Sequence, residues 1–240
     1  MLKNAIWPAL VAIGAVLSFG CFYVHDSETS GPVQTESRAV ELGGAESARV
    51  EVRMGAGDLN IAGGAQKLME AEFRYDRPSW KPDVRYDVSG LKGVLTIQQP
   101  QGHSFNTGNA KNEWNLKLNN DARIDMTVAL GAGEGHLDLG TLALKGLDIE
   151  MGAGELRVDL RGSPRRSYDV RIRGGVGDAN IYLPNKAGII ADVKGGLGAI
   201  SAHGMEQRGD SYVNSAYQKS EITIHLDVKG GIGSINLYAE

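Results

Sequence analysis

A glycine motif, G-x-G, recurs six times and constrains the fold more than any other feature of this 240-residue chain. Between four of the copies the first glycines are separated by 21, 23 and 21 residues, and the last copy follows after 35. Self-similarity at a period of this size is typical of proteins built from stacked repeats. The turn glycines are Gly55 and Gly57, Gly131 and Gly133, Gly152 and Gly154, Gly175 and Gly177, Gly196 and Gly198, and Gly231 and Gly233.

Apolar and mostly charged residues alternate on both sides of each motif. Residues 147–151 read LDIEM before one copy, and residues 156–160 read LRVDL after it. This alternation is typical of strands with one buried face. Glycine suits the turn between two such strands because it tolerates positive φ and sharp bends. The sequence therefore predicts an all-β, single-domain β-solenoid of stacked strands, with about 21 residues per rung.

The repeat becomes irregular in two places. Between Gly57 and Gly131 there is no clear copy, but strand-like runs at 71–75, 84–88 and 93–98 indicate irregular rungs or a cap. Before the last copy, residues 205–219 exceed one period and are predicted to form an extruded loop. A terminal rung ending at Glu240 would then present a free sheet edge to a second copy.

The N-terminal segment predicts attachment to a membrane. Residues 5–24 are uncharged and almost entirely apolar, and a helix of this length spans about 30 Å, the thickness of a bilayer core. Lys3 precedes the segment and acidic residues follow it, which places the rest of the chain outside the cytoplasm. Residues 17–21, LSFGC, also resemble a bacterial lipobox, so Cys21 is a candidate for lipidation; plain secretion is the third alternative.

The domain boundaries follow from composition. Residues 1–24 are either a membrane-anchor helix or a lipoprotein signal, and in both cases the body lies in the cell envelope. Residues 25–45 are rich in Ser, Glu, Gly and Thr, which predicts a flexible linker. Residues 46–240 are left for the solenoid domain.

The residues outside the repeat point to no catalytic chemistry. The net charge of -4 gives no basic footprint for nucleic acid. Nucleophile-elbow, phosphate-loop and zinc-protease motifs are absent from the sequence, and Cys21 is the one cysteine. We therefore expect no enzyme, no catalytic residue, no cofactor and no metal. A structural calcium ion remains an alternative for the acids that directly follow four of the motifs, Asp58, Glu134, Glu155 and Asp178.

Five segments together resemble the bacterial toastrack family, related to the LiaF-like C-terminal domain of cell-wall-active antibiotic response proteins. They are residues 113–118 (EWNLKL), 130–134 (LGAGE), 151–155 (MGAGE), 174–178 (GGVGD) and 227–235 (DVKGGIGSI). The resemblance covers roughly residues 50–240. It implies a toastrack-like β-solenoid domain that is exposed at the cell envelope and has no known catalytic residue.

The leading hypothesis for function is a non-enzymatic, membrane-tethered extracytoplasmic module that acts by interaction, in envelope stress sensing or organisation. Its partners would be the membrane, through residues 5–24 or a lipid on Cys21, and envelope proteins or a cell-wall polymer. One alternative is a polysaccharide- or peptidoglycan-binding module, which aligned exposed aromatic residues would favour; Tyr182 and Tyr238 are the outward candidates. The other is a β-helix hydrolase, which two carboxylates converging in a cleft would favour.

Overall fold

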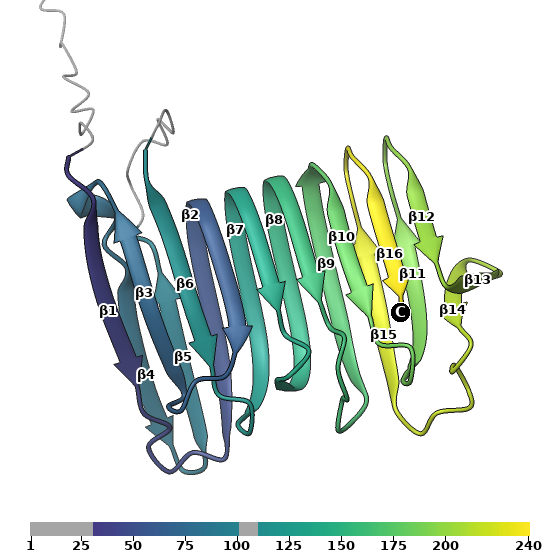
Figure 1. Cartoon of the computed structure of the whole chain (residues 1–240), viewed down its shortest axis with the longest axis horizontal. Helices are drawn as coiled ribbons and strands as arrows, with labels where there is room; N and C mark the ends of the chain where they lie inside the picture. Colours follow the sequence, from purple (N-terminus) through teal and green to yellow (C-terminus); the bar gives the residue numbers. More distant parts are fainter. Residues whose placement is uncertain (1–30, 101–109) are drawn as a thin grey trace, which may run out of the picture.

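The chain folds into a stack of hairpin-like rungs, seen in a computed structural model that describes residues 31–100 and 110–240 (Figure 1). The predicted all-β solenoid is confirmed. One short 3₁₀-helix, η1, covers Pro78–Trp80. The strands are β1 (Gln34–Val40), β2 (Ser47–Gly63), β3 (Met69–Tyr75), β4 (Asp83–Ser89), β5 (Lys92–Gln98), β6 (Asn112–Leu118), β7 (Arg123–Asp138), β8 (Ala143–Asp159), β9 (Tyr168–Val176), β10 (Ala179–Leu183), β11 (Gly188–Lys194), β12 (Ile200–His203), β13 (Met205–Arg208), β14 (Ser211–Asn214), β15 (Thr223–Lys229) and β16 (Ile235–Ala239).

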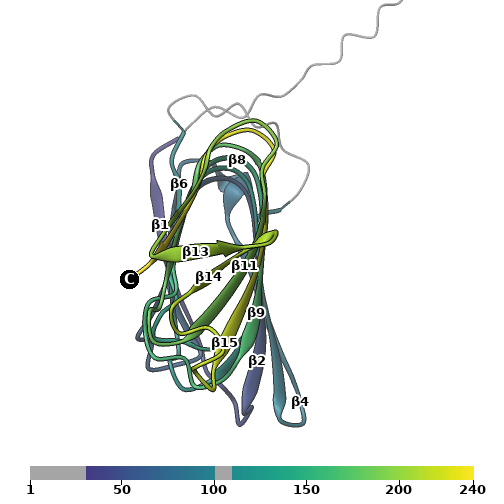
Figure 2. The same ribbon diagram turned by 90° about the vertical axis from the view of Figure 1, so that its right-hand side faces the viewer.

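The strands form one continuous sheet that bends back on itself at the G-x-G motifs, so two half-sheets face each other (Figure 2). Strands β2, β7 and β8 pass through the bend and belong to both halves. The first half-sheet, before the bends, has the order β4-β5-β2-β7-β8-β9-β15-β11-β14-β13. The second half-sheet, after the bends, has the order β1-β3-β6-β2-β7-β8-β10-β16-β12.

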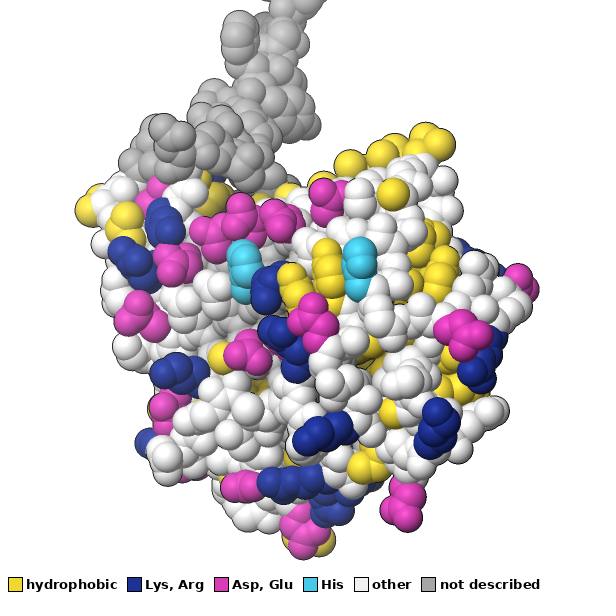
Figure 3. Space-filling model, turned by 45° about the vertical axis from the view of Figure 1, so that its right-hand side comes forward, with side chains coloured by type: hydrophobic (Ala, Val, Ile, Leu, Met, Phe, Trp, Pro, Cys, Tyr) yellow, Lys and Arg dark blue, Asp and Glu magenta, His cyan; other side chains and the backbone are white. Residues whose placement is uncertain are grey.

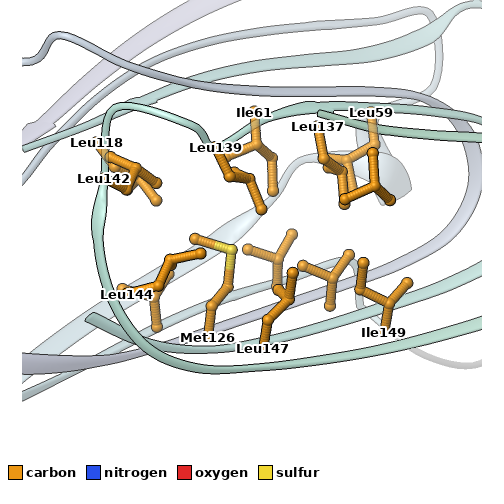
Figure 4. Close-up of a cluster of buried hydrophobic side chains, with 14 of the residues drawn as sticks. Leu59, Ile61, Leu118, Met126, Leu137, Leu139, Leu142, Leu144, Leu147 and Ile149 are labelled. Atoms are coloured by element: carbon orange, nitrogen blue, oxygen red, sulfur yellow. The ribbon is translucent and has the colours of Figure 1, made fainter. Parts of the chain in front are cut away.

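The core lies between the half-sheets and is made of the alternating apolar residues. Figure 4 shows Leu59, Ile61 and Leu137 of the second half-sheet facing Met126, Leu147 and Ile149 of the first. In-register pairing stacks like on like across the rungs, as in the row Val52, Val128, Ile149, Ile172, Val228 and Val193. Each buried aliphatic side chain of this kind stabilises the fold by about 1.5–3 kcal/mol. A single rung could not bury these side chains alone, so the core forms only when rungs stack.

The bends require glycine for two separate reasons. The second glycine of each motif has a φ between 121° and 148°, a region that other residues rarely adopt. In addition, a Cβ on Gly152 would lie 2.3 Å from the carbonyl oxygen of Gly131, and one on Gly154 would lie 1.9 Å from that of Gly133. The backbones of neighbouring rungs therefore touch at the bends, with no room for a side chain between them.

The last rung of the chain is not the last rung of the stack. β15 lies between β9 and β11, and β16 lies between β10 and β12, with parallel pairing on both sides. The expectation that a rung ending at Glu240 forms a free edge is therefore wrong, and β12 is the edge strand instead. Residues 205–219 give the chain the length it needs to turn back and enter this gap.

The predicted extruded loop at residues 205–219 is also wrong, because it contains the hairpin β13–β14. β14 pairs antiparallel with β11 and covers its outer edge. The buried side chain of Asn214 fixes this cap, since its Oδ1 accepts a 2.9 Å hydrogen bond from Ile189 N and its Nδ2 donates a 2.8 Å bond to Ala187 O.

The N-terminal third forms the other end of the stack. The strand-like runs at 71–75, 84–88 and 93–98 correspond to β3, β4 and β5. The linker predicted for residues 25–45 is wrong for Gln34–Val40, which form β1 and pair with β3. An exposed edge strand needs few apolar residues, so its composition matches that of a linker. Residues 5–24 and Cys21 lie outside the described residues, and within the described ranges no helix is long and apolar enough to span a membrane.

Candidate interaction face

The solvent side of the second half-sheet, here called the groove face, presents outward side chains in straight rows. The rows arise because the strands pair in register, so equivalent positions of neighbouring rungs lie side by side at about 4.8 Å. Every side chain of the central row can form hydrogen bonds. Across the strands this row reads Ser37, Glu72, Asn115, Asn60, His136, Arg157, Asn180, Asn236 and Ser201.

A shallow groove of about 970 Å³ runs over β1, β3, β6, β2, β7 and β8 on this face. Its depth comes from small side chains, such as Ala39 and Ala62, that lie among longer ones. Asn60 Nδ2 donates a 2.9 Å hydrogen bond to Asn115 Oδ1, which fixes two amides of the lining. Figure 3 shows acidic side chains along the upper edge of this face, with basic, hydrophobic and histidine side chains below.

A stack of three rings lies beside the groove on β10, β16 and β12. The ring centroids of Tyr182 and Tyr238 are 4.9 Å apart with an interplanar angle of 14°, and those of His203 and Tyr238 are 4.9 Å apart at 7°. Arg157 covers the other face of Tyr182 at 4.0 Å from the centroid, and its Nη1 donates a 2.7 Å hydrogen bond to the Tyr182 hydroxyl. Both faces of Tyr182 and Tyr238 are therefore occupied within the protein.

The sequence identified Tyr182 and Tyr238 as outward residues but did not place them together or beside His203. They occur on segments that are far apart in the chain, and their contact depends on the insertion of β16 between β10 and β12. The alternation of apolar and polar residues within each segment does not indicate that β16 lies between β10 and β12.

Arg161 links the ring stack to the C-terminal end of β8, since its guanidinium lies 4.8 Å from the Tyr182 ring centroid and pairs with Asp159. Arg161 Nη2 lies 2.6 Å from Asp159 Oδ2, and Arg161 Nη1 donates a 3.1 Å hydrogen bond to Glu240 Oε2. Burial alone would raise the pKa of Asp159, but the hydrogen bonds and the charge of Arg161 outweigh it and hold the pKa below its usual value. Asp159 is therefore ionised at neutral pH.

Replacing Asp159 with asparagine should destabilise the domain at neutral pH by about 0.2–1 kcal/mol, the range for a partly exposed ion pair. Because the folded-state pKa is lowered, the stabilisation is fully present above the unfolded pKa and is lost as the pH falls through the folded one. Urea unfolding of both proteins at neutral and strongly acidic pH measures this. A difference that stays constant into acid would rule out the ionised carboxylate as its source.

The acids considered for calcium form part of another row, next to the bends. Asp58, Glu134 and Glu155 are in register on neighbouring rungs. Asp178 follows, and its Oδ1 accepts a 2.7 Å hydrogen bond from Ser234 N. Within residues 31–100 and 110–240, no group of three or more His, Cys, Asp or Glu side chains is placed to hold a metal ion.

Comparison with known proteins places the fold in a family. The model of the N-terminal domain of toast_rack (DUF2154) matches residues 29–182. A crystal structure of a candidate cell adhesion protein from Clostridium sporogenes ATCC 15579 is 36% identical, with a TM-score of 0.85 over 87% of this chain and 100% of that chain.

Two further structures cover the chain to a similar extent but are remote. Candidate adhesins from Bacteroides fragilis NCTC 9343 and Parabacteroides merdae ATCC 43184 are 10% and 12% identical, with TM-scores of 0.28 and 0.27. Each comparison covers 87% of this chain and 98% of the other. No protein with a curated description matches the chain. The family model and the Clostridium structure together establish that this chain belongs to the toast_rack family, as the five resembling segments predicted.

Proposed function

We propose that this chain is a non-enzymatic, membrane-tethered interaction module of the cell envelope that binds a protein partner along its groove face. The family and the candidate adhesion role of the similar Clostridium protein suggest a non-catalytic interaction module. The observation that carries the proposal is the groove itself, which is open, built on a hydrogen-bonded stack and lined by donors, acceptors and charges of both signs.

The chemistry of the groove favours a polypeptide as the occupant. Its lining combines amides, carboxylates and cations, which can bond to the backbone amides and charged side chains of another protein. Glu72 and Asp138 offer acceptors, and Lys117 offers a cation, within the same groove. A surface of this length suits envelope organisation or stress sensing, where a partner has to be held along a rigid support.

Tethering at the envelope is the second part of the proposal. The apolar run at residues 5–24, or a lipid on Cys21, would hold the domain outside the cytoplasm. The partner would then be another envelope protein that is within reach of the membrane.

Two observations weigh against the alternatives. Polysaccharide binding would use open aromatic faces, and both faces of Tyr182 and of Tyr238 are already covered by other side chains. Two carboxylates, Asp138 and Asp159, do lie in register in the groove, as a hydrolase would require. However, Arg161 pairs with Asp159 and holds its pKa below the usual value, whereas a general acid needs a raised pKa.

Site-directed photocrosslinking tests the proposal. A photoreactive amino acid replaces His136, which lines the groove, or Asp169, which is exposed on the first half-sheet. In membranes of the native host, the label at position 136 should yield a discrete protein adduct that the label at 169 does not.

Binding of the purified partner provides the matched control. Ala62→Arg fills the groove, whereas Ala129→Arg changes an outward alanine of the first half-sheet. The first change should weaken binding at least about tenfold, or about 1.4 kcal/mol, and the second should not. Equal weakening by both variants, or an adduct made of glycan, would contradict a protein partner in the groove.

A further inference from the structure

The G-x-G bends together form one edge of the stack. Halfway along this edge, the central residue of the motif changes from alanine to a larger apolar residue. The central residue of the motif is Ala56, Ala132 or Ala153 in β2, β7 and β8. In the last three rungs it is Val176, Ile232 and Leu197, with 54%, 53% and 71% of their surface exposed. β-bridges from Ile232 to both Val176 and Leu197 place these three side by side. We call these three residues the corner ridge.

The core does not require these side chains at the corner. In β2, β7 and β8 the residue just before the motif is Met54, Leu130 or Met151, and each is buried. In the last three rungs this position is Gly174, Gly230 or Gly195. The large apolar side chain has thus moved from the inside of the bend to the outside. Contiguous exposed apolar side chains of this kind mark contact sites.

The charges beside the bends change at the same place. Arg173, Lys229 and Lys194 lie in register, each three residues before a residue of the corner ridge. The equivalent positions in β2, β7 and β8 are Arg53, Ala129 and Glu150. Among the described residues, Arg173 and Lys194 have no ion-pair partner within 4.0 Å, and Lys229 pairs with Asp227 at 3.3 Å.

The acidic row ends with Asp178, on the first rung of the ridge. Its positions carry Asp58, Glu134, Glu155 and Asp178, and then Ser234 and Ala199 on the last two rungs. Figure 3 shows acidic side chains along the upper edge nearer the grey segment and hydrophobic ones along the same edge farther from it. An apolar strip flanked by a row of cations is the chemistry that binds a membrane interface with anionic lipids.

The N-terminal chain enters the domain at this same edge. Gln34 pairs with Tyr75, and Tyr75 pairs with Asn112. Asn112 lies at the bend, because the next residue, Glu113, pairs with Asp58, which directly follows Gly57. Figure 1 shows the start of β1 and the bends together at the top of the molecule.

The short connection to the apolar N-terminal run limits how far this edge can lie from a membrane. About ten residues separate position 24 from Gln34, and they span at most about 36 Å when fully extended. The first ridge rung lies six strands from β1, or about 29 Å along the edge. The tether and the corner ridge therefore lie at opposite ends of the same edge of the stack, and both can face one membrane surface.

We propose that the corner ridge docks on the bilayer surface, with Val176, Ile232 and Leu197 in the interfacial region and Arg173, Lys229 and Lys194 near the lipid phosphates. The inference rests on the membrane tether of the proposed function. The domain then stands on its bend edge, held at one end by the tether and at the other by the ridge. The groove face is left pointing sideways and open to a partner.

Lipid quenching in the full chain tests this arrangement. An environment-sensitive fluorescent amino acid replaces Leu197, or the exposed Asn185 between β10 and β11 as the control. The protein is reconstituted into vesicles of phosphatidylcholine and phosphatidylglycerol that contain a lipid with a nitroxide near its headgroup. We expect quenching at position 197 to be roughly threefold greater than at 185, as for a side chain at the interface.

Two variants identify the source of the quenching. The double variant Val176→Ser/Ile232→Ser should reduce quenching at 197 to the level of 185 while its thermal unfolding stays unchanged. The double variant Arg173→Gln/Lys194→Gln should abolish the excess of quenching in vesicles with phosphatidylglycerol over vesicles without it.

Flotation of the vesicles separates the two proposals. If the chain floats and position 197 is quenched no more than 185, the ridge proposal is overturned and the tether stands. The same holds if a photoreactive amino acid at position 197 crosslinks to a second copy, because the ridge is then a contact between copies. If the chain does not float with the vesicles, the tether and the ridge proposal both fail.

Discussion

Replacing Gly154 with alanine is expected to destabilise the domain by about 4 kcal/mol or more, which is exceptional for one methyl group. Gly154 has a φ of 127°, and its new Cβ would lie 1.9 Å from the carbonyl oxygen of Gly133. The backbone conformation alone costs about 1–3 kcal/mol. The overlap adds to this, because β8 must move away from β7 in the middle of the stack and strain their shared hydrogen bonds.

Two other glycines separate these causes. Gly64 has a φ of 102°, and a Cβ added there would meet no atom within 4 Å, so Gly64→Ala should show the conformational cost alone, about 1–3 kcal/mol. Gly174 has an ordinary φ and equally open space, so Gly174→Ala should be within about 0.5 kcal/mol of the parent. Urea unfolding of the three variants gives the comparison. If Gly154→Ala costs no more than Gly64→Ala, contact between rungs is not the reason for glycine at the bends.

Replacing Trp114 with alanine should cost about 3–5 kcal/mol, the usual range for a buried tryptophan. Its side chain is fully buried and meets Phe73 edge to face, with centroids 5.5 Å apart. Its Nε1 donates a 3.1 Å hydrogen bond to Asn112 Oδ1, and Asn112 Nδ2 donates a 2.7 Å bond to Ala56 O. The residue therefore ties β3 and β6 to the bend of the first rung, and its loss should loosen that whole end.

Trp114→Phe distinguishes the packing from the hydrogen bond. It keeps most of the apolar volume but leaves Asn112 Oδ1 without its donor, which should cost about 1–3 kcal/mol. Thermal and urea unfolding measure both variants. A loss below about 1 kcal/mol for Trp114→Ala would mean that the N-terminal end does not depend on this side chain.

The rungs could be predicted because each one repeats the same local information. The alternation in residues 147–151 determines which side chains of β8 face the core, and the glycines that follow determine where the strand bends. In-register stacking follows once every rung carries the same pattern, since a shift of one residue would turn the apolar set outward. These features depend on neighbours in the chain, so a single sequence reveals them.

The order of the rungs depends on distant contacts and was not predictable. The segments around Val193 and Val228 carry the same alternation. Nothing in either segment indicates that β15 lies between β9 and β11 in the sheet. The ring stack of Tyr182, Tyr238 and His203 was missed for the same reason. Strand β1 was missed because edge strands are polar, and the groove because it depends on the small size of Ala39 and Ala62 next to longer neighbours.

The inserted rung also affects how the protein is made. Strands β11 and β12 leave the ribosome before β15 and β16, which must lie between them and β9 and β10. Equivalent positions of the two segments are 35 residues apart in the chain, and translation of that length takes roughly two to seven seconds. Throughout that delay the growing stack exposes the unpaired edges of β9 and β10, and the next rung to emerge is the wrong one to fill them. Correct assembly therefore requires β9 and β10 to end up paired with the later rung and not with β11 and β12, which are made first.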